Sequence, residues 1–409
     1  MRTWILCLCV FISASAWADE GCEKRLKNYQ DLLACVVEKS PEIENRQLEV
    51  ETARAQIKAA GQWKNPELSA ESFQGKIRGV EQTSTDISLG IPIEWGSKIS
   101  ARQAVAQGGA DAAEARLSLA RARVKAEAIL KLHRLRQVLH EQEIAEEAIG
   151  TFTRLVEQYR KRPGLSPEQQ TSLSVYQLAK GEYELQKSAA GDEVLAIETF
   201  FKLQMDLDLA KLKSYLPSSP QSWPSVKQEG GNLSSPSQKL LKADVDIARG
   251  ELSAAQGEAW PTMMVGPSVQ IQREGGQSNT IMGFNLSMPL PVFNLNGAGR
   301  ATAAAGLKTA EAKARFGLKE QDLRKKELIE VYTQAVRSLS HGISHEEIEK
   351  RHHDLEKLFM RGVVPSALII DAHRTSLDLE KTRHERELRA LQSYLELATM
   401  ADRLEDVSL

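Results

Sequence analysis

Histidine is the residue type whose spacing in this sequence could support chemistry. Six of the eight histidines lie between residues 341 and 384. His341, His345 and His352 follow one another at intervals that would place them on one face of a continuous helix. Imidazoles arranged in this way can bind a transition metal such as zinc. A solvated, mildly pH-sensitive helix face explains the same spacing, and we favour this second interpretation, so no metal site is expected.

Two cysteines form a second candidate site. The N-terminal residues 1–18 have the pattern of a cleaved signal peptide, with Arg2 before a short apolar core and a small-residue site ending at Ala18. We therefore expect export into an oxidising compartment, in which Cys22 and Cys35 remain after cleavage. Either they form a disulfide that closes a short N-terminal loop, or they are two independent thiols.

Catalytic and nucleic-acid motifs do not accompany these residues. The sequence contains no HExxH, no CxxC, no GxSxG and no phosphate-binding loop. Lys and Arg number 53 against 55 Asp and Glu, so the chain has no basic footprint for nucleic acid. We expect no enzyme activity, no cofactor and no nucleic-acid partner.

An internal repeat organises the chain. Ser40-Pro41 recurs as Ser235-Pro236, and Pro66 recurs as Pro261. A period of roughly 200 residues is far longer than a solenoid unit, which indicates one duplicated domain. We assign residues 19–215 to the first unit and residues 236–409 to the second. The segment 216–235 between them is rich in Pro, Gly and Ser and is predicted to be a linker.

Long proline-free segments in each unit predict very long helices. The runs 93–162, 168–216, 292–364 and 366–409 contain no proline and are rich in strong helix formers. Isolated glycines, including Gly342, weaken such a helix but need not end it. The segments 162–167 and 361–366 combine Gly with Ser and Pro, which predicts the tight tips of two antiparallel helical hairpins.

Alternating apolar and polar residues precede each hairpin and predict β-strands. We place strands at about 66–74 and 82–95 in the first unit, and at about 262–272 and 280–293 in the second. Their length and their single apolar face are those of transmembrane strands, although a half-buried soluble sheet shows the same alternation. The apolar positions include Ile87, Leu89, Ile91, Phe284, Leu286 and Met288.

Aromatic residues at the strand ends favour the transmembrane interpretation. Trp63, Trp95, Trp260 and Phe293 lie where the predicted strands meet the long helices, as an interfacial aromatic belt would. Four strands cannot close a barrel, and lipid does not tolerate an open sheet edge. Several copies of the chain must therefore each contribute four strands.

Together these features resemble the TolC-type outer membrane factors, and most closely the CzcC-like cation-efflux branch. The resemblance covers nearly the whole mature chain. Its most specific marks are Ser40-Pro41-Glu42-Ile43, the duplicated strand and helix units, and the two tips. It implies an α+β membrane protein in which three chains share a twelve-stranded barrel that continues into a periplasmic α-barrel. It also implies an exit duct for metal cations or other substrates, delivered by an inner-membrane pump of the RND type through a periplasmic adaptor.

The resemblance also assigns roles to residues. It implies that the adaptor docks at the tips, which comprise Gly164, Leu165, Ser166, Gly362, Val363, Val364, Pro365 and Ser366. It implies an acidic ring at the narrowest part of the lumen, to which Asp371 would contribute. Leu368 stands where a second acidic residue often occurs, so the ring would be weaker here. A solvated helix position is the alternative for Asp371.

A periplasmic coiled-coil adaptor or scaffold is the alternative function. Such a protein would have one hairpin flanked by the two halves of a β-module. Here the β segments precede each of two hairpins. A detergent-requiring oligomer would favour the duct, and a soluble periplasmic protein would favour the adaptor.

Overall fold

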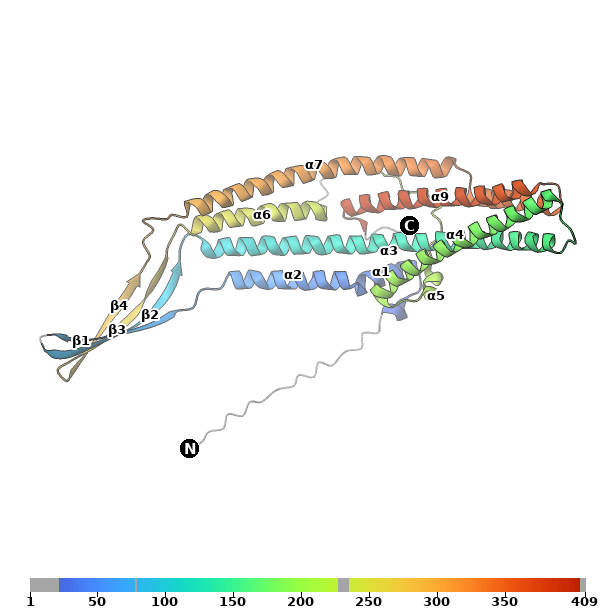
Figure 1. Cartoon of the computed structure of the whole chain (residues 1–409). Coiled ribbons are helices and arrows are strands. Elements are labelled where there is room, and N and C mark those ends of the chain that lie inside the picture. The colour runs from blue at the N-terminus through green and yellow to red at the C-terminus, as the bar shows by residue number, and fades with distance from the viewer. Residues whose placement is uncertain (1–21, 78, 227–234, 405–409) are drawn as a thin grey trace, which may run out of the picture.

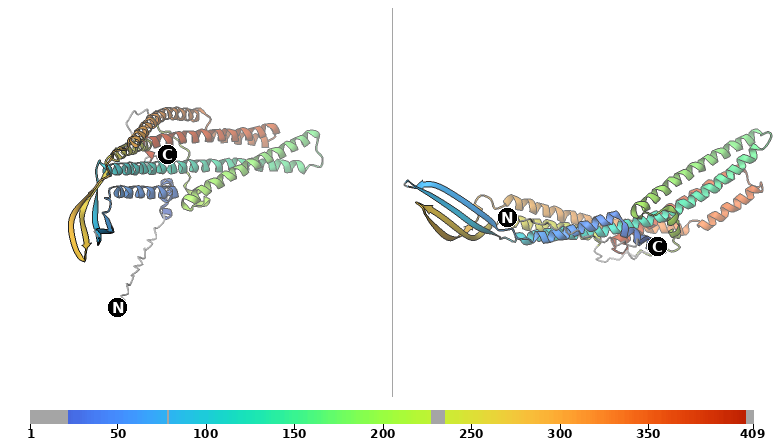
Figure 2. Two further views of the ribbon diagram at one scale, coloured as in Figure 1. Left: turned by 60° about the vertical axis from the view of Figure 1, so that its left-hand side comes forward. Right: turned by 90° about the horizontal axis from the view of Figure 1, so that it is seen from below.

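The computed structural model describes residues 22–77, 79–226 and 235–404, and these form a long rod with a sheet at one end (Figure 1). Helices make up the rest of the rod. Figure 2 shows that the rod is bent and that its far end divides into two separate helical tips. The predicted signal peptide, residues 1–18, and part of the predicted linker, residues 227–234, lie outside the described residues.

The helical elements of the first half are η1 (Cys22–Arg25), α1 (Tyr29–Lys39), α2 (Pro41–Ala60), α3 (Lys98–Arg160), α4 (Pro167–Met205), α5 (Leu209–Leu212) and η2 (Lys213–Tyr215). Those of the second half are α6 (Pro236–Gly257), α7 (Gly297–His341), α8 (His345–Met360) and α9 (Ser366–Met400). The strands are β1 (Glu67–Ile77), β2 (Val80–Glu94), β3 (Thr262–Glu274) and β4 (Gln277–Ser287).

Long helices lie in all four proline-free runs, although α4 ends at Met205, before the end of the predicted run 168–216. The longest, α3, runs from the sheet to a tip (Figure 1). Its 63 residues correspond to about 95 Å at 1.5 Å per residue. It packs against α2 and α6 near the sheet and against α4 and α9 toward the tip. The order helix, two strands and long helix occurs once before the linker and once after it. The long helix α3 therefore connects the sheet with the residues that lie near the tips.

The second long helix is interrupted, contrary to the expectation that Gly342 need not end it. α7 ends at His341, and Gly342 adopts an extended conformation. Ser344 then caps α8, accepting a hydrogen bond of 3.2 Å from the backbone N–H of Glu347. A glycine followed closely by a serine N-cap supplies both a stop signal and a start signal, and together they outweigh the helix propensity of the flanking residues.

The sheet is antiparallel throughout, with the strand order β1-β2-β3-β4. Pairing of β1 with β2 continues to Ile77 and Val80, so this turn is shorter than the sequence suggested. Pairing of β3 with β4 likewise continues to Glu274 and Gln277. Gly275 and Gly276 form this turn with positive φ angles of 56° and 88°, as a two-residue hairpin requires.

The fourth strand ends earlier than predicted. β4 stops at Ser287, whereas the alternation of the sequence continues to residue 293. Pro289 and Pro291 lack the backbone N–H that a strand interior donates, which explains why pairing stops before them. The predicted apolar position Met288 therefore lies just beyond the strand.

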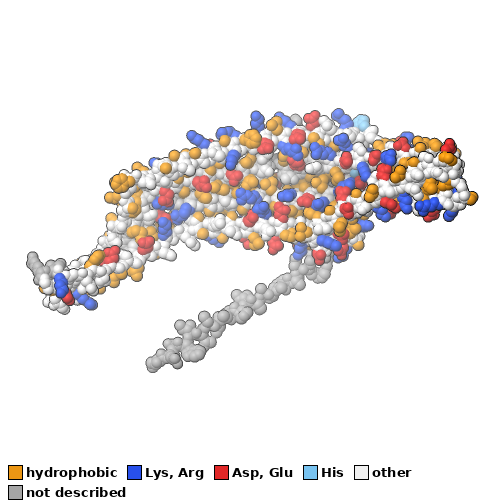
Figure 3. All heavy atoms as spheres, viewed as in Figure 1, with side chains coloured by type: hydrophobic (Ala, Val, Ile, Leu, Met, Phe, Trp, Pro, Cys, Tyr) orange, Lys and Arg blue, Asp and Glu red, His pale blue; other side chains and the backbone are white. Residues whose placement is uncertain are grey.

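Apolar packing stabilises the helical part of the rod. One core lies between α1, α3 and α4 and includes Leu132 and Phe201, and a second lies near the tips around Phe152. The structure joins Cys22 and Cys35 in a disulfide with a Cα–Cα distance of 5.6 Å, which attaches η1 to α1. In Figure 3, basic and acidic side chains are interspersed over the helices, in keeping with the nearly balanced net charge.

None of the helices in the part of the chain that the structure describes has the length and apolar character needed to cross a membrane.

Candidate functional site

The two faces of the sheet differ sharply in polarity. Ile87 pairs with Ala70 on one side and with Val269 on the other, and Val269 pairs with Met282. Residues that pair directly point to the same face, so Ala70, Ile87, Val269 and Met282 lie together on one face of the sheet. This apolar face is exposed, with Met282 at 83%. Nothing in the described part of the chain covers it.

The opposite face of the sheet is polar and internally hydrogen-bonded. The hydroxyls of Ser69 and Ser88 lie 2.7 Å apart, and Asn285 Nδ2 donates to Ser88 Oγ at 3.4 Å. Gln270 Nε2 donates to Ser84 Oγ at 3.2 Å. A sheet with one exposed apolar face and one polar face is suited to separate lipid from an aqueous lumen.

Four aromatic side chains lie around the junction between sheet and helices. Trp63, Trp95, Trp260 and Phe293 are all more than half exposed, and Phe293 is fully exposed. Large exposed aromatic residues at the end of an exposed apolar surface form the pattern of a membrane–water interface.

The first predicted tip lies between α3 and α4. Ser166 caps α4 in a capping box: its Oγ accepts from the Gln169 N–H at 3.3 Å, and its own N–H donates to Gln169 Oε1 at 3.1 Å. Leu165 is half-buried, whereas Gly164 is exposed. Gly164 has no positive φ angle, and a side chain at this position would meet no atom within 4 Å. A left-handed glycine is therefore not needed at this tip.

The second predicted tip, between α8 and α9, does require glycine. Gly362 has a φ angle of 72°. Its N–H donates to the carbonyl of Phe359 at 2.8 Å, and the N–H of Val363 donates to that of Leu358 at 3.1 Å. This pair of bonds is a Schellman motif, which ends α8. Val363 is 68% exposed, Val364 is half-buried, and Pro365 precedes Ser366, the first residue of α9.

Asp371 lies on α9 near this tip and is exposed. Its neighbours Ile369 and Ile370 are buried in the apolar core near the tips. Because these two residues anchor one face of α9 in the core, Asp371 lies on a face that points away from it. Arg374 follows on the same helix and donates to Glu182 Oε2 of α4 at 2.9 Å. The Asp371 carboxylate therefore faces solvent in the single chain, with a cationic residue one turn away.

The histidines at 341, 345 and 352 do not share one continuous helix face. His341 ends α7 and is exposed, while His345 begins α8 after the break at Gly342. His352 is buried two turns further along α8. The structure instead brings His345 and His352 separately against residues of α3 and α9.

We call the resulting contact between α3, α8 and α9 the polar seam. On α3 it contains His133, His140 and Glu147, each seven residues from the next. On α9 it contains Glu387, Glu380 and His373 at the same spacing in the antiparallel direction. His345 and His352 of α8 lie against the last two levels of this series.

At the first level of the polar seam a buried carboxylate is held ionised. Glu387 forms an ion pair with Arg136 and accepts a hydrogen bond of 3.0 Å from Ser219 Oγ. His133 Nδ1 lies 3.5 Å from the same carboxylate. Burial of Glu387 opposes its ionisation, but the neighbouring His133 and the charge of Arg136 outweigh burial and lower its pKa to about 2.

At the second level imidazoles and carboxylates alternate. His345 Nδ1 lies 2.7 Å from Glu380 Oε1, and His384 Nδ1 lies 2.7 Å from Glu141 Oε1. Burial lowers the pKa of His140, and the nearby His345 lowers it further. Hydrogen bonding to Glu380 raises the pKa of His345. The level thus contains a neutral imidazole beside one that is paired with an acid.

The third level lies closest to the tips. His352 and His373 have ring centroids 4.4 Å apart, and His352 Nε2 lies 3.8 Å from Glu147 Oε1. Burial and the neighbouring His352 lower the pKa of His373 to about 4, so this ring is neutral near pH 7.

The histidines of residues 341–384, taken alone, do not reveal the polar seam. The signal was present in the seven-residue steps 133, 140, 147 and 373, 380, 387. Side chains seven residues apart return to the same helix face, so each series marks one contact line. Which two lines meet depends on how the two hairpins pack, and that information comes from the structure.

The arrangement of sheet and helices is the fold of known outer-membrane channels. No protein-family model matches the chain, and no curated protein matches it. Solved structures do resemble it, at sequence identities that establish the fold alone.

Three of these structures are outer-membrane proteins of named bacteria. The outer membrane channel CmeC of Campylobacter jejuni has a TM-score of 0.68 at 13% identity, covering 94% of this chain and 86% of CmeC. The outer membrane protein VceC of Vibrio cholerae has a TM-score of 0.66 at 14% identity, covering 91% and 96%. The outer membrane channel MtrE of Neisseria gonorrhoeae has a TM-score of 0.66 at 14% identity, covering 92% and 89%.

Proposed function

We propose that this chain is the outer-membrane exit duct of a tripartite efflux system and acts as a homotrimer without catalytic chemistry. The observation that carries the proposal is the sheet, whose exposed apolar face and hydrogen-bonded polar face suit lipid on one side and a lumen on the other. The similarity of the fold to solved outer-membrane channels supports the same location.

The open edges of the sheet support an oligomer. β1 and β4 each pair on one side only within the described chain. An open edge is not tolerated in lipid, so β1 of one copy is expected to pair with β4 of the next. Two copies would give a barrel of about eight strands, whose interior is filled by side chains. Three copies give twelve strands and leave room for a passage, which favours the trimer.

The tips are the proposed docking surface for a periplasmic adaptor. They lie at the end of the rod opposite the sheet (Figure 1), about the length of α3 away from the membrane. The exposed Val363 and the half-buried Leu165 offer apolar contacts on compact turns. The adaptor would connect the duct to an inner-membrane pump, for which we propose the RND type. The CzcC-like resemblance of the sequence extends the proposal to metal cations as cargo.

A periplasmic adaptor or scaffold is the competing function. The sheet argues against it, because all four strands form one continuous sheet at one end of the rod rather than a module flanking a single hairpin. An adaptor would also have no use for a large exposed apolar face.

Membrane fractionation tests the proposal. The full-length chain, produced in a Gram-negative host, should be found in the outer-membrane fraction and should require detergent for extraction. Chemical crosslinking should then trap a species of three chains. Recovery as a soluble protein in the periplasmic extract would refute the duct and favour the adaptor.

A further inference from the structure

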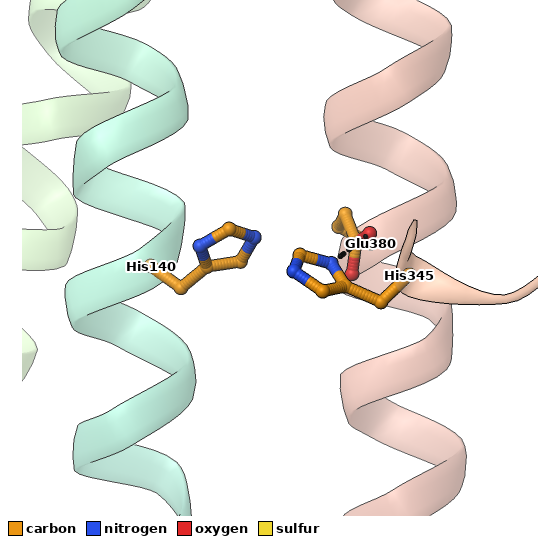
Figure 4. A group of neighbouring side chains, drawn as sticks. All are labelled: His140, His345 and Glu380. Carbon is orange, nitrogen blue, oxygen red and sulfur yellow. Dashed lines mark hydrogen bonds and ion pairs between the residues drawn. The ribbon is translucent and has the colours of Figure 1, made fainter. Parts of the chain in front are cut away.

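The second level of the polar seam brings together a set of metal-ligating side chains from three helices. His140 comes from the middle of α3, His345 is the first residue of α8, and Glu380 lies on α9. One donor atom from each lies within 4.8 Å of the others. Figure 4 shows the rings of His140 and His345 pointing toward each other between the helices, with Glu380 beside His345.

The side chains at this level have donor atoms that could bind a cation. His140 Nε2 is buried and has no hydrogen-bond partner. His345 Nδ1 and Glu380 Oε1 lie 2.7 Å apart and share a hydrogen bond, so a cation that displaces the shared proton would meet both donor atoms.

A fourth donor lies adjacent. His384 uses Nδ1 for its contact with Glu141, and its Nε2 lies 3.8 Å from Glu380 Oε2. Glu141 is itself held by Arg134 at 2.7 Å. His384 therefore has one nitrogen held by a carboxylate, as metal-binding histidines commonly do, and the other nitrogen near the cluster.

We propose that His140, His345 and Glu380 bind one divalent transition-metal ion such as Zn²⁺, with His384 placed to complete the coordination. Two imidazoles and one carboxylate are a known ligand set for zinc. Donor atoms in a tetrahedral zinc site lie roughly 3.4 Å apart. Side-chain movements of about 1 Å would bring the three donor atoms, which now lie within 4.8 Å of one another, to that separation. His345 is half-exposed and provides the path by which an ion enters.

A neighbouring cluster on the third level is a poorer site. Glu147, His352 and Glu356 also place donor atoms within 4.8 Å of one another. This cluster contains one imidazole, and Glu356 already accepts a hydrogen bond of 2.9 Å from Thr151. A guanidinium nitrogen of Arg154 lies 3.6 Å from Glu356, and this positive charge opposes a second cation.

Metal binding at the second level would join the two halves of the chain. α3 belongs to the half before the linker, and α8 and α9 belong to the half after it. An ion bound by all three helices would fix the position of the α8–α9 hairpin against α3. The site lies within one chain, so the inference stands whether or not the chain acts as a duct.

Titration of the full-length chain with Zn²⁺ tests the site. The protein should be purified in detergent without a polyhistidine tag and freed of metal, and binding measured by calorimetry and by the visible absorption of Co²⁺ as a substitute. We expect one strong site per chain. His140→Ala and Glu380→Gln should each weaken Zn²⁺ binding by at least about tenfold.

Two further variants keep the test decisive. His345→Ala changes a half-exposed residue at a helix start, so it should fold normally while losing binding in the same way. His341→Ala is the matched control, because His341 is exposed at the end of α7 and lies outside the cluster. The inference is overturned if the wild-type chain binds no Zn²⁺, if His140→Ala, His345→Ala and Glu380→Gln bind it as the wild type does, or if His352→Ala alone removes the site.

Discussion

The two ends of the rod distribute polar and apolar side chains in opposite ways. At the sheet end, Leu89, Met282 and other large apolar residues are exposed, and the polar residues gather on the opposite face. Toward the tips, apolar residues such as Phe152 are buried. From the middle of α3 toward the tips, the polar seam places His133, Glu380 and Glu387 inside the protein.

Under the proposed function, this difference matches two ends that meet different surroundings. An exposed apolar face is costly in water and favourable in lipid, so the sheet end fits a membrane. Buried charges are costly in any surroundings unless they are paired, and the buried carboxylates of the first two levels of the polar seam, Glu387, Glu380 and Glu141, have partners. In the proposed duct, lipid would stabilise the exposed apolar face of the sheet, whereas the polar seam is stabilised by its own ion pairs.

The largest expected effect lies at the sheet end. Leu89→Arg places a charge on the apolar face and should cost about 2–4 kcal/mol of insertion free energy near the middle of the bilayer. Ser88→Arg, one residue away on the polar face, should be far milder. The amount of heat-resistant oligomer in outer-membrane fractions measures both variants. Equal losses for the two would show that the faces of the sheet do not differ in surroundings.

The next largest effect lies in the polar seam. Glu387→Gln removes the charge that pairs with Arg136 and should destabilise the helical region by about 3 kcal/mol, the lower end for a broken buried pair because Arg136 remains partly exposed. The thermal loss of helical circular dichroism measures this change. Glu385→Gln, at an exposed position of the same helix, is the control and should have little effect.

The same variant has a defined pH dependence. The pKa of Glu387 is lowered from 4.5 to about 2 in the folded chain. Its ionised form therefore contributes stability that is fully present above pH 4.5 and is lost as the pH falls through about 2. The stability difference between wild type and Glu387→Gln should be constant above that window and shrink within it. A difference that grows on acidification would contradict the assignment of Glu387 as the charged member of the pair.

The sequence predicted the sheet end better than the polar seam. Period-two alternation predicts both strand and face, because the register of an antiparallel pair keeps like faces together. The absence of proline predicted α3 almost to its ends. The break at Gly342 depends on a serine N-cap, and the early end of β4 depends on two prolines. The long helical and alternating patterns around these residues obscured both local signals. The polar seam depends on contacts between distant segments, which one helix pattern cannot provide.

A smaller effect is expected at the tips. Gly362→Ala forces a side chain into a left-handed conformation and should cost about 1–2 kcal/mol locally, which would loosen the end of α8. Gly164→Ala is the matched control, because Gly164 needs no positive φ angle. Export of a pump substrate should fall for Gly362→Ala, and crosslinks from Val363 to a periplasmic adaptor should weaken. Equal export by both glycine variants would remove the proposed role of the second tip.

Substitution of Asp371 is expected to have the smallest effect on stability and the most specific effect on function. This carboxylate is exposed near the second tip, and its removal should leave the free energy of unfolding almost unchanged. If α9 lines the lumen of a trimer, three such carboxylates would raise the local cation concentration. Arg374, one turn away, offsets part of that field, so a moderate effect is expected.

Asp371→Asn should reduce the cation selectivity measured from reversal potentials in planar bilayers, while single-channel conductance changes less. Asp354→Asn, at an exposed position on α8 of the same hairpin, is the control. Unchanged selectivity in Asp371→Asn would assign Asp371 to the solvated surface of α9 and leave the polar character of this end to the buried seam alone.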